Sequence, residues 1–298
     1  MIPRVYHVPP RGFHAPRPGV VPTAPGVTVV EVGRCARRPA PPPVPVFPSA
    51  PAPVQAPAPP IQPPPTEGKP MPRKRHDQVT ADEWTDFLDA FDALHTLGGP
   101  FPRLTDFADA HATLFDGCGG RHSHHPHFLP WVRHLLHRFE RALQETRRGA
   151  SVPYWSWEVD PAIPAALDQP ELLERWRVVR QFRFHEMPPR ELMDAVRAIK
   201  RFDVFQRMLE IAVHAEVVAA VAGADAHGRR GTFATAAATR DPLFWVHLAN
   251  IDRMWVEFQA RCPQEGPRTP REVLEPAPLF GVPVQAVLTV QTLGYAYA

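Results

Sequence analysis

Histidine is concentrated in one short stretch of this chain, HSHHPHFLPWVRHLLHRFERALQ, which covers residues 122–144. His122, His124, His125 and His127 all lie within six residues. Neutral imidazole is a common ligand for copper and zinc, so this cluster could supply several nitrogens to one ion. A histidine-rich run is also typical of a solvated surface loop that binds metals only adventitiously. Metal binding is therefore the first chemistry to test against the rest of the sequence.

Long helices could position such ligands. Apolar residues recur at helical spacing in four segments, which are residues 80–99, 129–149, 201–223 and 242–263. The first opens with Thr80 and Glu83 at capping-box spacing, the third ends at Gly223, and Pro263 stops the fourth. The third is apolar on most sides, which indicates a central helix.

Two shorter segments complete the expected fold. Residues 190–199 indicate a further, short helix, and only residues 282–298 show the β-branched alternation of a strand. We therefore expect a mainly α domain, built as a four-helix bundle with a short C-terminal β segment.

The N-terminal quarter differs in composition from the rest. Twenty-three of the forty prolines lie in residues 1–72, and residues 1–75 carry ten Lys and Arg against two acids. Such a segment lacks the backbone donors and the apolar periodicity needed for packing. We expect a disordered basic Pro-rich tail over residues 1–76 and a folded domain over residues 77–298.

The composition also bounds partners and compartment. The tail suits proline-recognising domains or acidic surfaces, or serves as a solvated tether, and we do not expect nucleic acid to be a partner. No apolar run approaches the ~20 residues of a membrane span, and the N-terminus lacks the apolar core of a secretory signal. Three widely spaced cysteines argue against a disulfide framework. We expect an intracellular, cytoplasmic protein.

Several blocks of the sequence, taken together and in order, resemble the tyrosinase family of dinuclear type 3 copper proteins. The blocks are LTDFADAH (104–111), HFLPWVRHLLHRFERAL (127–143), VPYWSW (152–157), MLEIAVHAEVVAAVAG (208–223), DPLFWVHLANIDRMW (241–255) and LGYAYA (293–298). The resemblance implies a helical bundle in which six histidines hold two copper ions. In that family the metal pair binds dioxygen and oxidises phenols and catechols.

For the first copper, the resemblance places the three ligands on one histidine and two other residues. His111 retains the first ligand. The second falls on Ser123, which His122 and His124 flank, so a shift of one residue could restore a nitrogen. The third directly follows FLPW and falls on Val132, which has no lone pair to offer.

For the second copper, only the first ligand survives, as His214. The other two positions are the aliphatic residues Val218 and Leu248. His247 corresponds to the neighbour of a ligand. Asp252 matches an acid that, in the family, orients a ligand without binding the metal itself. In this chain Asp252 either keeps that role, or caps a helix or pairs with an arginine such as Arg253.

Two interpretations remain open. In the first, the bundle has been repacked around an absent metal, binds no copper or at most one ion, and serves as a binding or scaffold module without oxidase activity. In the second, the chain is a divergent copper-dependent oxidoreductase or holds a mononuclear site. That site would use His111, His214 and the 122–127 histidine cluster, with His122, His124 and His125 as the nearest candidates.

Overall fold

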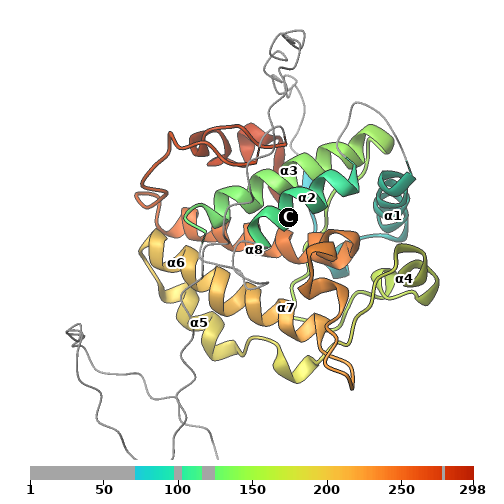
Figure 1. Cartoon of the computed structure of the whole chain (residues 1–298). Coiled ribbons are helices and arrows are strands. Elements are labelled where there is room, and N and C mark those ends of the chain that lie inside the picture. Colours follow the sequence, from blue (N-terminus) through green and yellow to red (C-terminus); the bar gives the residue numbers. More distant parts are fainter. Residues whose placement is uncertain (1–70, 97–102, 116–124, 277–278) are drawn as a thin grey trace, which may run out of the picture. The chain divides into compact units, whose positions relative to one another are not determined.

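The computed structural model describes residues 71–96, 103–115, 125–276 and 279–298. This part of the chain is mainly helical (Figure 1). The α-helices are α1 (Ala81–Thr96), α2 (Leu104–Phe115), α3 (Phe128–Thr146), α4 (Pro170–Trp176), α5 (Arg190–Ala198), α6 (Phe202–Met208), α7 (Ala215–Ala222) and α8 (Pro242–Arg261). The strands β1 (Met71–Arg73) and β2 (Tyr295–Tyr297) pair in parallel. The predicted fold class, mainly α with a short C-terminal β segment, is confirmed.

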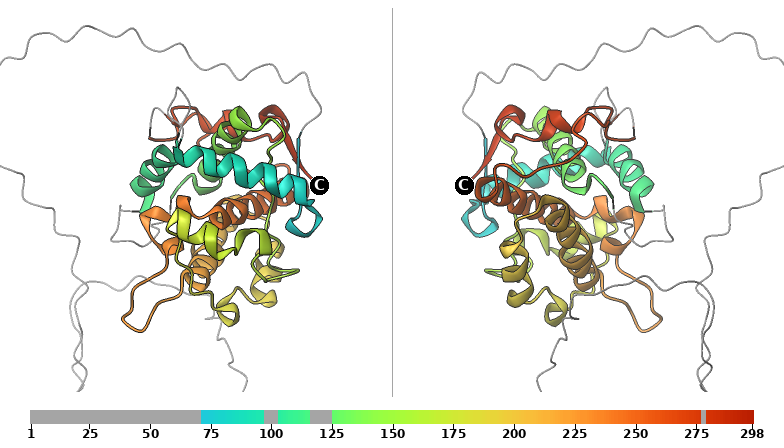
Figure 2. Two further views of the ribbon diagram at one scale, coloured as in Figure 1. Left: turned by 90° about the vertical axis from the view of Figure 1, so that its right-hand side faces the viewer. Right: turned by 90° about the vertical axis from the view of Figure 1, so that its left-hand side faces the viewer.

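Helix α8 lies between α1–α3 on one side and α5–α7 on the other (Figures 1 and 2). Because it is covered from both sides, its sequence is apolar around most of the helix, and Trp245 stacks on Phe139 of α3 with ring centroids 3.6 Å apart. Asp241 caps its start by accepting from the backbone N–H of Leu243 at 2.8 Å. Despite its length, neither α8 nor another described helix is long and apolar enough to cross a membrane.

The local signals for α1 and α3 are confirmed in the structure. Glu83 accepts from the backbone N–H of Thr80 at 2.8 Å, and the Thr80 hydroxyl accepts from the N–H of Glu83 at 3.3 Å. This is the predicted capping box. The apolar stripe of α3 is fully buried, with Leu135, Leu136 and Phe139 at 0% exposure.

The helix expected over 201–223 is interrupted by a π-helix at Leu209–His214, between α6 and α7. It ends as predicted at Gly223, which has φ +56° and approaches Gln181 so closely that a Cβ would lie 2.2 Å from its carbonyl oxygen. The expectation that this helix is central is only partly correct, because Val204 and Ile211 on one face are 43% and 44% exposed.

Other elements differ from the expectation. Periodicity did not predict helices α2 and α4. The segment 282–298 contains 3₁₀ turns at Val284–Val287 and Gln291–Leu293, and only Tyr295–Tyr297 is a strand. The strand is this short because its partner β1 offers three residues for pairing.

The folded domain begins earlier than residue 77, where the sequence placed the boundary. Met71–Arg73 forms β1, and His76–Gln78 forms a 3₁₀ turn before α1. The physical reason is Arg73, a residue of the supposed tail, which is 0% exposed. Of the predicted disordered tail, residues 1–76, residues 1–70 lie outside the described residues.

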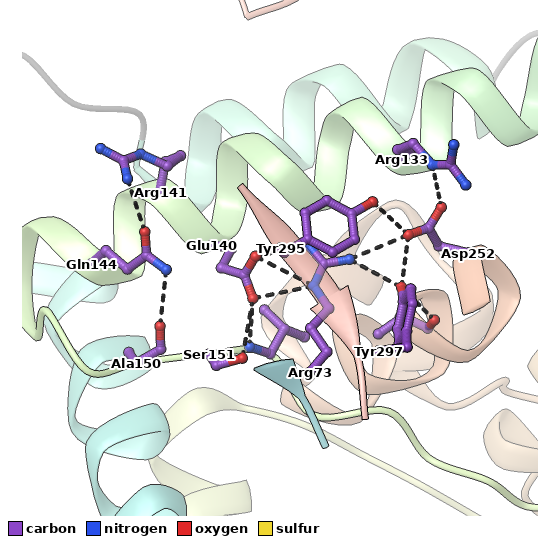
Figure 3. Close-up of polar contacts among 12 residues, drawn as sticks. Arg73, Arg133, Glu140, Arg141, Gln144, Ala150, Ser151, Asp252, Tyr295 and Tyr297 are labelled. Carbon is purple, nitrogen blue, oxygen red and sulfur yellow. Dashed lines mark hydrogen bonds and ion pairs between the residues drawn. The ribbon is translucent and has the colours of Figure 1, made fainter. Parts of the chain in front are cut away.

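Arg73 belongs to a buried ion cluster that joins the two strands to α3 and α8 (Figure 3). We define this ion cluster as Arg73, Arg133, Glu140 and Asp252, together with the hydroxyls of Tyr295 and Tyr297. Asp252 accepts from Arg133 Nε at 2.6 Å and from both tyrosine hydroxyls at 2.7 Å. Arg73 reaches Glu140 at 2.9 Å and Asp252 at 3.3 Å. Two guanidinium groups therefore face two carboxylates, and the cluster is neutral.

The environment of the ion cluster favours its charged form. Burial alone would raise the pKa of Asp252, but the neighbouring Arg133 and Arg73 hold it below its ordinary value. Burial and the nearby Asp252 raise the pKa of Tyr295 and Tyr297 well above the usual range, so both phenols stay protonated and donate. Arg73 also stacks on the Tyr295 ring, with its guanidinium carbon 3.6 Å from the centroid.

We predict that Asp252→Asn lowers the free energy of unfolding by about 3–5 kcal/mol, because it leaves buried guanidinium charge without its partner. Urea denaturation of the two proteins measures this. As the matched control, Asp89→Asn removes a carboxylate from an exposed pair with Arg147 and should change stability by less than about 1 kcal/mol. Equal effects of the two substitutions would contradict the structural role of the ion cluster.

Candidate functional site

The three aliphatic residues at the family's ligand positions lie in the core of the domain. Val132 on α3 and Leu248 on α8 are each 1% exposed, and Val218 on α7 is 6% exposed. All three belong to one continuous hydrophobic cluster. Aliphatic side chains offer no lone pair, so these positions cannot coordinate a metal ion.

His111 lies in the same core but against an aromatic ring. It is 3% exposed on α2, and its imidazole meets the edge of Phe244 of α8 with ring centroids 5.0 Å apart. Of the predicted ligands of the first copper, it is the one that the structure describes, because His122, Ser123 and His124 lie outside the described residues.

His214 is the last residue of the π-helix and is hydrogen-bonded to His247 of α8. The Nδ1 of His214 lies 2.9 Å from the Nε2 of His247, and the two rings are within 8° of parallel. One nitrogen of this pair must donate and the other accept. The ring nitrogen of His214 that faces His247 could meet a metal ion only after this bond is broken.

His247 is a buried neutral imidazole. It is 0% exposed, and burial lowers its pKa to about 3. Its Nδ1 has no hydrogen-bond partner among the described residues. The resemblance predicts His247 only as the neighbour of a ligand, and the structure places it in direct contact with His214.

The described members of the histidine cluster contact carboxylates. The backbone N–H of His125 donates to Glu210 at 2.8 Å, and the Nε2 of His127 lies 2.5 Å from a carboxylate oxygen of Glu272. His127 donates its backbone N–H to His125 Nδ1 at 3.1 Å. Neither acid was predicted from the sequence. The signal for Glu210 was available as a single acid within the apolar run MLEIAVH.

His134 and Asp252 both contact protein groups other than those at the ligand positions. His134 faces the C-terminal segment, where its Nε2 donates to the carbonyl of Leu279 at 3.3 Å. It therefore does not replace the nitrogen missing at Val132. Asp252 pairs with an arginine as predicted, but with Arg133 and Arg73 rather than with Arg253, which instead contacts Asn250, Glu257 and Glu158.

The donor set does not fit a dicopper centre. In the second site, whose three positions are all described, one imidazole remains and two positions are aliphatic. Across residues 71–96, 103–115, 125–276 and 279–298, no group of three or more His, Cys, Asp or Glu side chains is arranged to hold a metal ion. What these residues form in the described core is a hydrogen-bonded histidine pair surrounded by apolar side chains.

Buried histidines give the stability of the protein a predictable dependence on pH. Burial lowers the pKa of both His134 and His247 to about 3, whereas an exposed histidine titrates near 6.5. The unfolded chain therefore binds more protons below about pH 6.5. The free energy of unfolding should fall as the pH drops below that value, on the order of 1 kcal/mol per pH unit for each histidine.

Urea denaturation at a series of pH values between about 7 and 4.5 measures this slope. His134→Gln should reduce the slope, because one titrating group is removed. His185→Gln should leave it unchanged, because the His185 side chain is 79% exposed. A slope that is the same in all three proteins would contradict the assignment.

Comparisons with known proteins agree with this fold. The family model for the common central domain of tyrosinase matches residues 102–187 and 167–261, together more than half of the chain. The tyrosinase of Streptomyces glaucescens is 29% identical over 235 residues, which cover 65% of this chain and 84% of that protein. The tyrosinase of Streptomyces antibioticus is also 29% identical, over 241 residues that cover 64% of this chain and 84% of that protein.

Solved structures share the fold at lower identity. A functional unit of Octopus hemocyanin superimposes with a TM-score of 0.59 at 20% identity, covering 76% of this chain and 68% of that one. The polyphenol oxidase of Grenache grape (Vitis vinifera) gives a TM-score of 0.54 at 18% identity, covering 77% of this chain and 85% of that one. With the matched central domain and the ordered sequence blocks, these likenesses lead to one assignment: the chain belongs to the tyrosinase family.

Proposed function

We propose that this chain is a tyrosinase-fold protein that has lost dicopper phenol oxidation and acts as a binding or scaffold module. The observation that carries the proposal is the burial of Val132, Val218 and Leu248 at three of the six ligand positions. Copper, where it is bound in this family, supplies dioxygen chemistry. The residues of this chain do not fit a copper pair, so the proposed role does not involve that chemistry.

Energetic reasoning supports a repacked core over an empty metal site. A polar pocket without its metal would leave voids and buried polar atoms without partners, each costing on the order of 1 kcal/mol or more. Aliphatic side chains at three positions remove both costs there. The remaining imidazole of the second site, His214, has its hydrogen bond to His247 instead.

The interaction role is assigned to the basic Pro-rich tail, residues 1–70. Its composition suits proline-recognising domains or acidic surfaces, and the folded domain would then serve as the anchor. The alternative is a divergent oxidase or a mononuclear metal site that uses His111, His214 and the 122–127 cluster. Copper loading distinguishes it from the proposed function.

We predict that the full chain, loaded with copper and passed through a desalting column, retains no stoichiometric copper and does not oxidise catechol above background. Metal analysis per chain and an oxygen-uptake assay measure the two quantities. The matched control carries alanine at His122, His124, His125 and His127, and should retain the same low amount of copper as the unmodified chain.

Other results would change the proposal. Two copper ions per chain together with catechol oxidation would overturn it. One copper ion that disappears in the alanine control would favour the mononuclear site.

A second prediction concerns rebuilding the metal centre. The quadruple variant Ser123→His, Val132→His, Val218→His and Leu248→His should be less stable than the unmodified chain without metal, because the imidazoles introduced at the buried positions 132, 218 and 248 lack partners. Copper should then raise its melting temperature through binding to the folded state, whereas the unmodified chain should not respond.

The matched control for the rebuilt centre adds His214→Ala to the same four substitutions. It removes one ligand of the second copper, so it should take up less copper and show a smaller rise in melting temperature. If the folded quadruple variant takes up no copper, the assignment of ligand positions is wrong.

A further inference from the structure

A cavity of about 710 Å³ lies on the α5 side of α8, away from the ligand positions. Its walls come from the segment around Trp157, the turn at Phe184–Glu186, α5, and Arg253 of α8. None of the five described ligand positions of the family lines it. We refer to it as the α5 cavity, and its volume is within the range of pockets that hold small organic ligands.

The wall of the α5 cavity contains a buried donor without a partner. Trp157 is 2% exposed, and its indole N–H makes no hydrogen bond to any described residue. Its near neighbour Trp155 is satisfied, because its indole N–H donates to the carbonyl of Ala162 at 2.9 Å. A buried N–H left unpaired is unfavourable, so a ligand acceptor that reaches the Trp157 nitrogen would stabilise the complex.

Donors also outnumber acceptors among the charged groups of the wall. Four guanidinium groups face two carboxylates; the residues are Arg75, Arg190, Arg197, Arg253, Glu158 and Asp194. Glu158 forms ion pairs with Arg197 at 2.5 Å and with Arg253 at 3.8 Å. Two acids outside the wall also form ion pairs with these arginines, Asp77 with Arg75 and Glu257 with Arg253. Each guanidinium has five N–H groups, so several remain for a ligand with negatively charged oxygens.

The apolar part of the α5 cavity is exposed to solvent. Phe184 and Val159 are 59% and 65% exposed, although both are large apolar side chains. Met187 and Met193 also line the wall, and methionine adapts its shape to different apolar groups. An aromatic or aliphatic body in the cavity would cover this surface and gain hydrophobic free energy.

We propose that the α5 cavity binds a small organic anion, with a carboxylate or sulfonate directed to Trp157 and the arginines and an apolar body against Phe184 and the methionines. The inference goes beyond the proposed function and does not depend on it, because the α5 cavity shares no residue with the ligand positions. Loss or retention of copper therefore leaves this proposal unchanged.

A matched pair of fluorescent probes tests the proposal on the full chain. Anilinonaphthalene sulfonate carries an aromatic body and an anion, and N-phenylnaphthylamine has the same rings without the anion. The sulfonate should bind one site per chain at least about tenfold more tightly than the neutral probe, as expected for charge-assisted hydrogen bonds. Titration calorimetry gives the stoichiometry and the affinity.

Variants locate the site. Trp157→Phe removes the indole N–H and keeps an aromatic ring, and should weaken sulfonate binding about tenfold, whereas Trp84→Phe outside the α5 cavity should not. If Trp157→Phe does not fold, Phe184→Ala tests the same site, because an exposed side chain can be truncated safely. Its control is Val179→Ala, since Val179 is 55% exposed and does not line the cavity.

The expected result is weaker binding in Phe184→Ala and unchanged binding in Val179→Ala. Equal affinity for the two probes would overturn the anionic character of the ligand. Binding that is the same in the cavity variants and their controls would overturn the α5 cavity as the site.

Discussion

The packing of the described domain depends on the contacts of one buried carboxylate, that of Asp252. It is fully buried and accepts hydrogen bonds from Arg133, Tyr295 and Tyr297. It also forms an ion pair with Arg73. Removing two carboxylates and two guanidinium groups from water is costly, and here the cost is offset by nearly complete pairing within the neutral ion cluster. One side chain thereby ties the first described strand and the last to the two longest helices.

The ion cluster also holds two helices of the core beside the family's ligand positions. Val132 directly precedes Arg133 on α3, and Leu248 lies one turn before Asp252 on α8. The ion cluster therefore fixes the two helices next to the positions where this family has ligands. With the helices held in this way, aliphatic side chains can fill the centre while the fold remains that of a tyrosinase.

A family fold does not by itself assign an activity, because function depends on the side chains at a site. At three ligand positions of the family this domain has buried aliphatic side chains, and the remaining imidazole of the second site, His214, is hydrogen-bonded to His247. The wall of the α5 cavity differs, since four guanidinium groups there face two carboxylates, and the buried indole N–H of Trp157 has no partner among the described residues.

The sequence by itself determined helices α1, α3, α5 and α8, the family and the identity of the residues at the ligand positions, because capping boxes, apolar periodicity and anchors such as FLPW are local signals. Only the tertiary structure decided that Arg73 is buried, since a charged residue next to a Pro-rich tail is expected to be exposed. Its partners Glu140 and Asp252 lie 67 and 179 residues away in the sequence. The sequence likewise did not predict the hydrogen bond between His214 and His247. Nor did it predict that one face of the helical segment 202–222 is exposed. Each depends on how helices distant in the sequence approach each other, and local patterns carry no information about that.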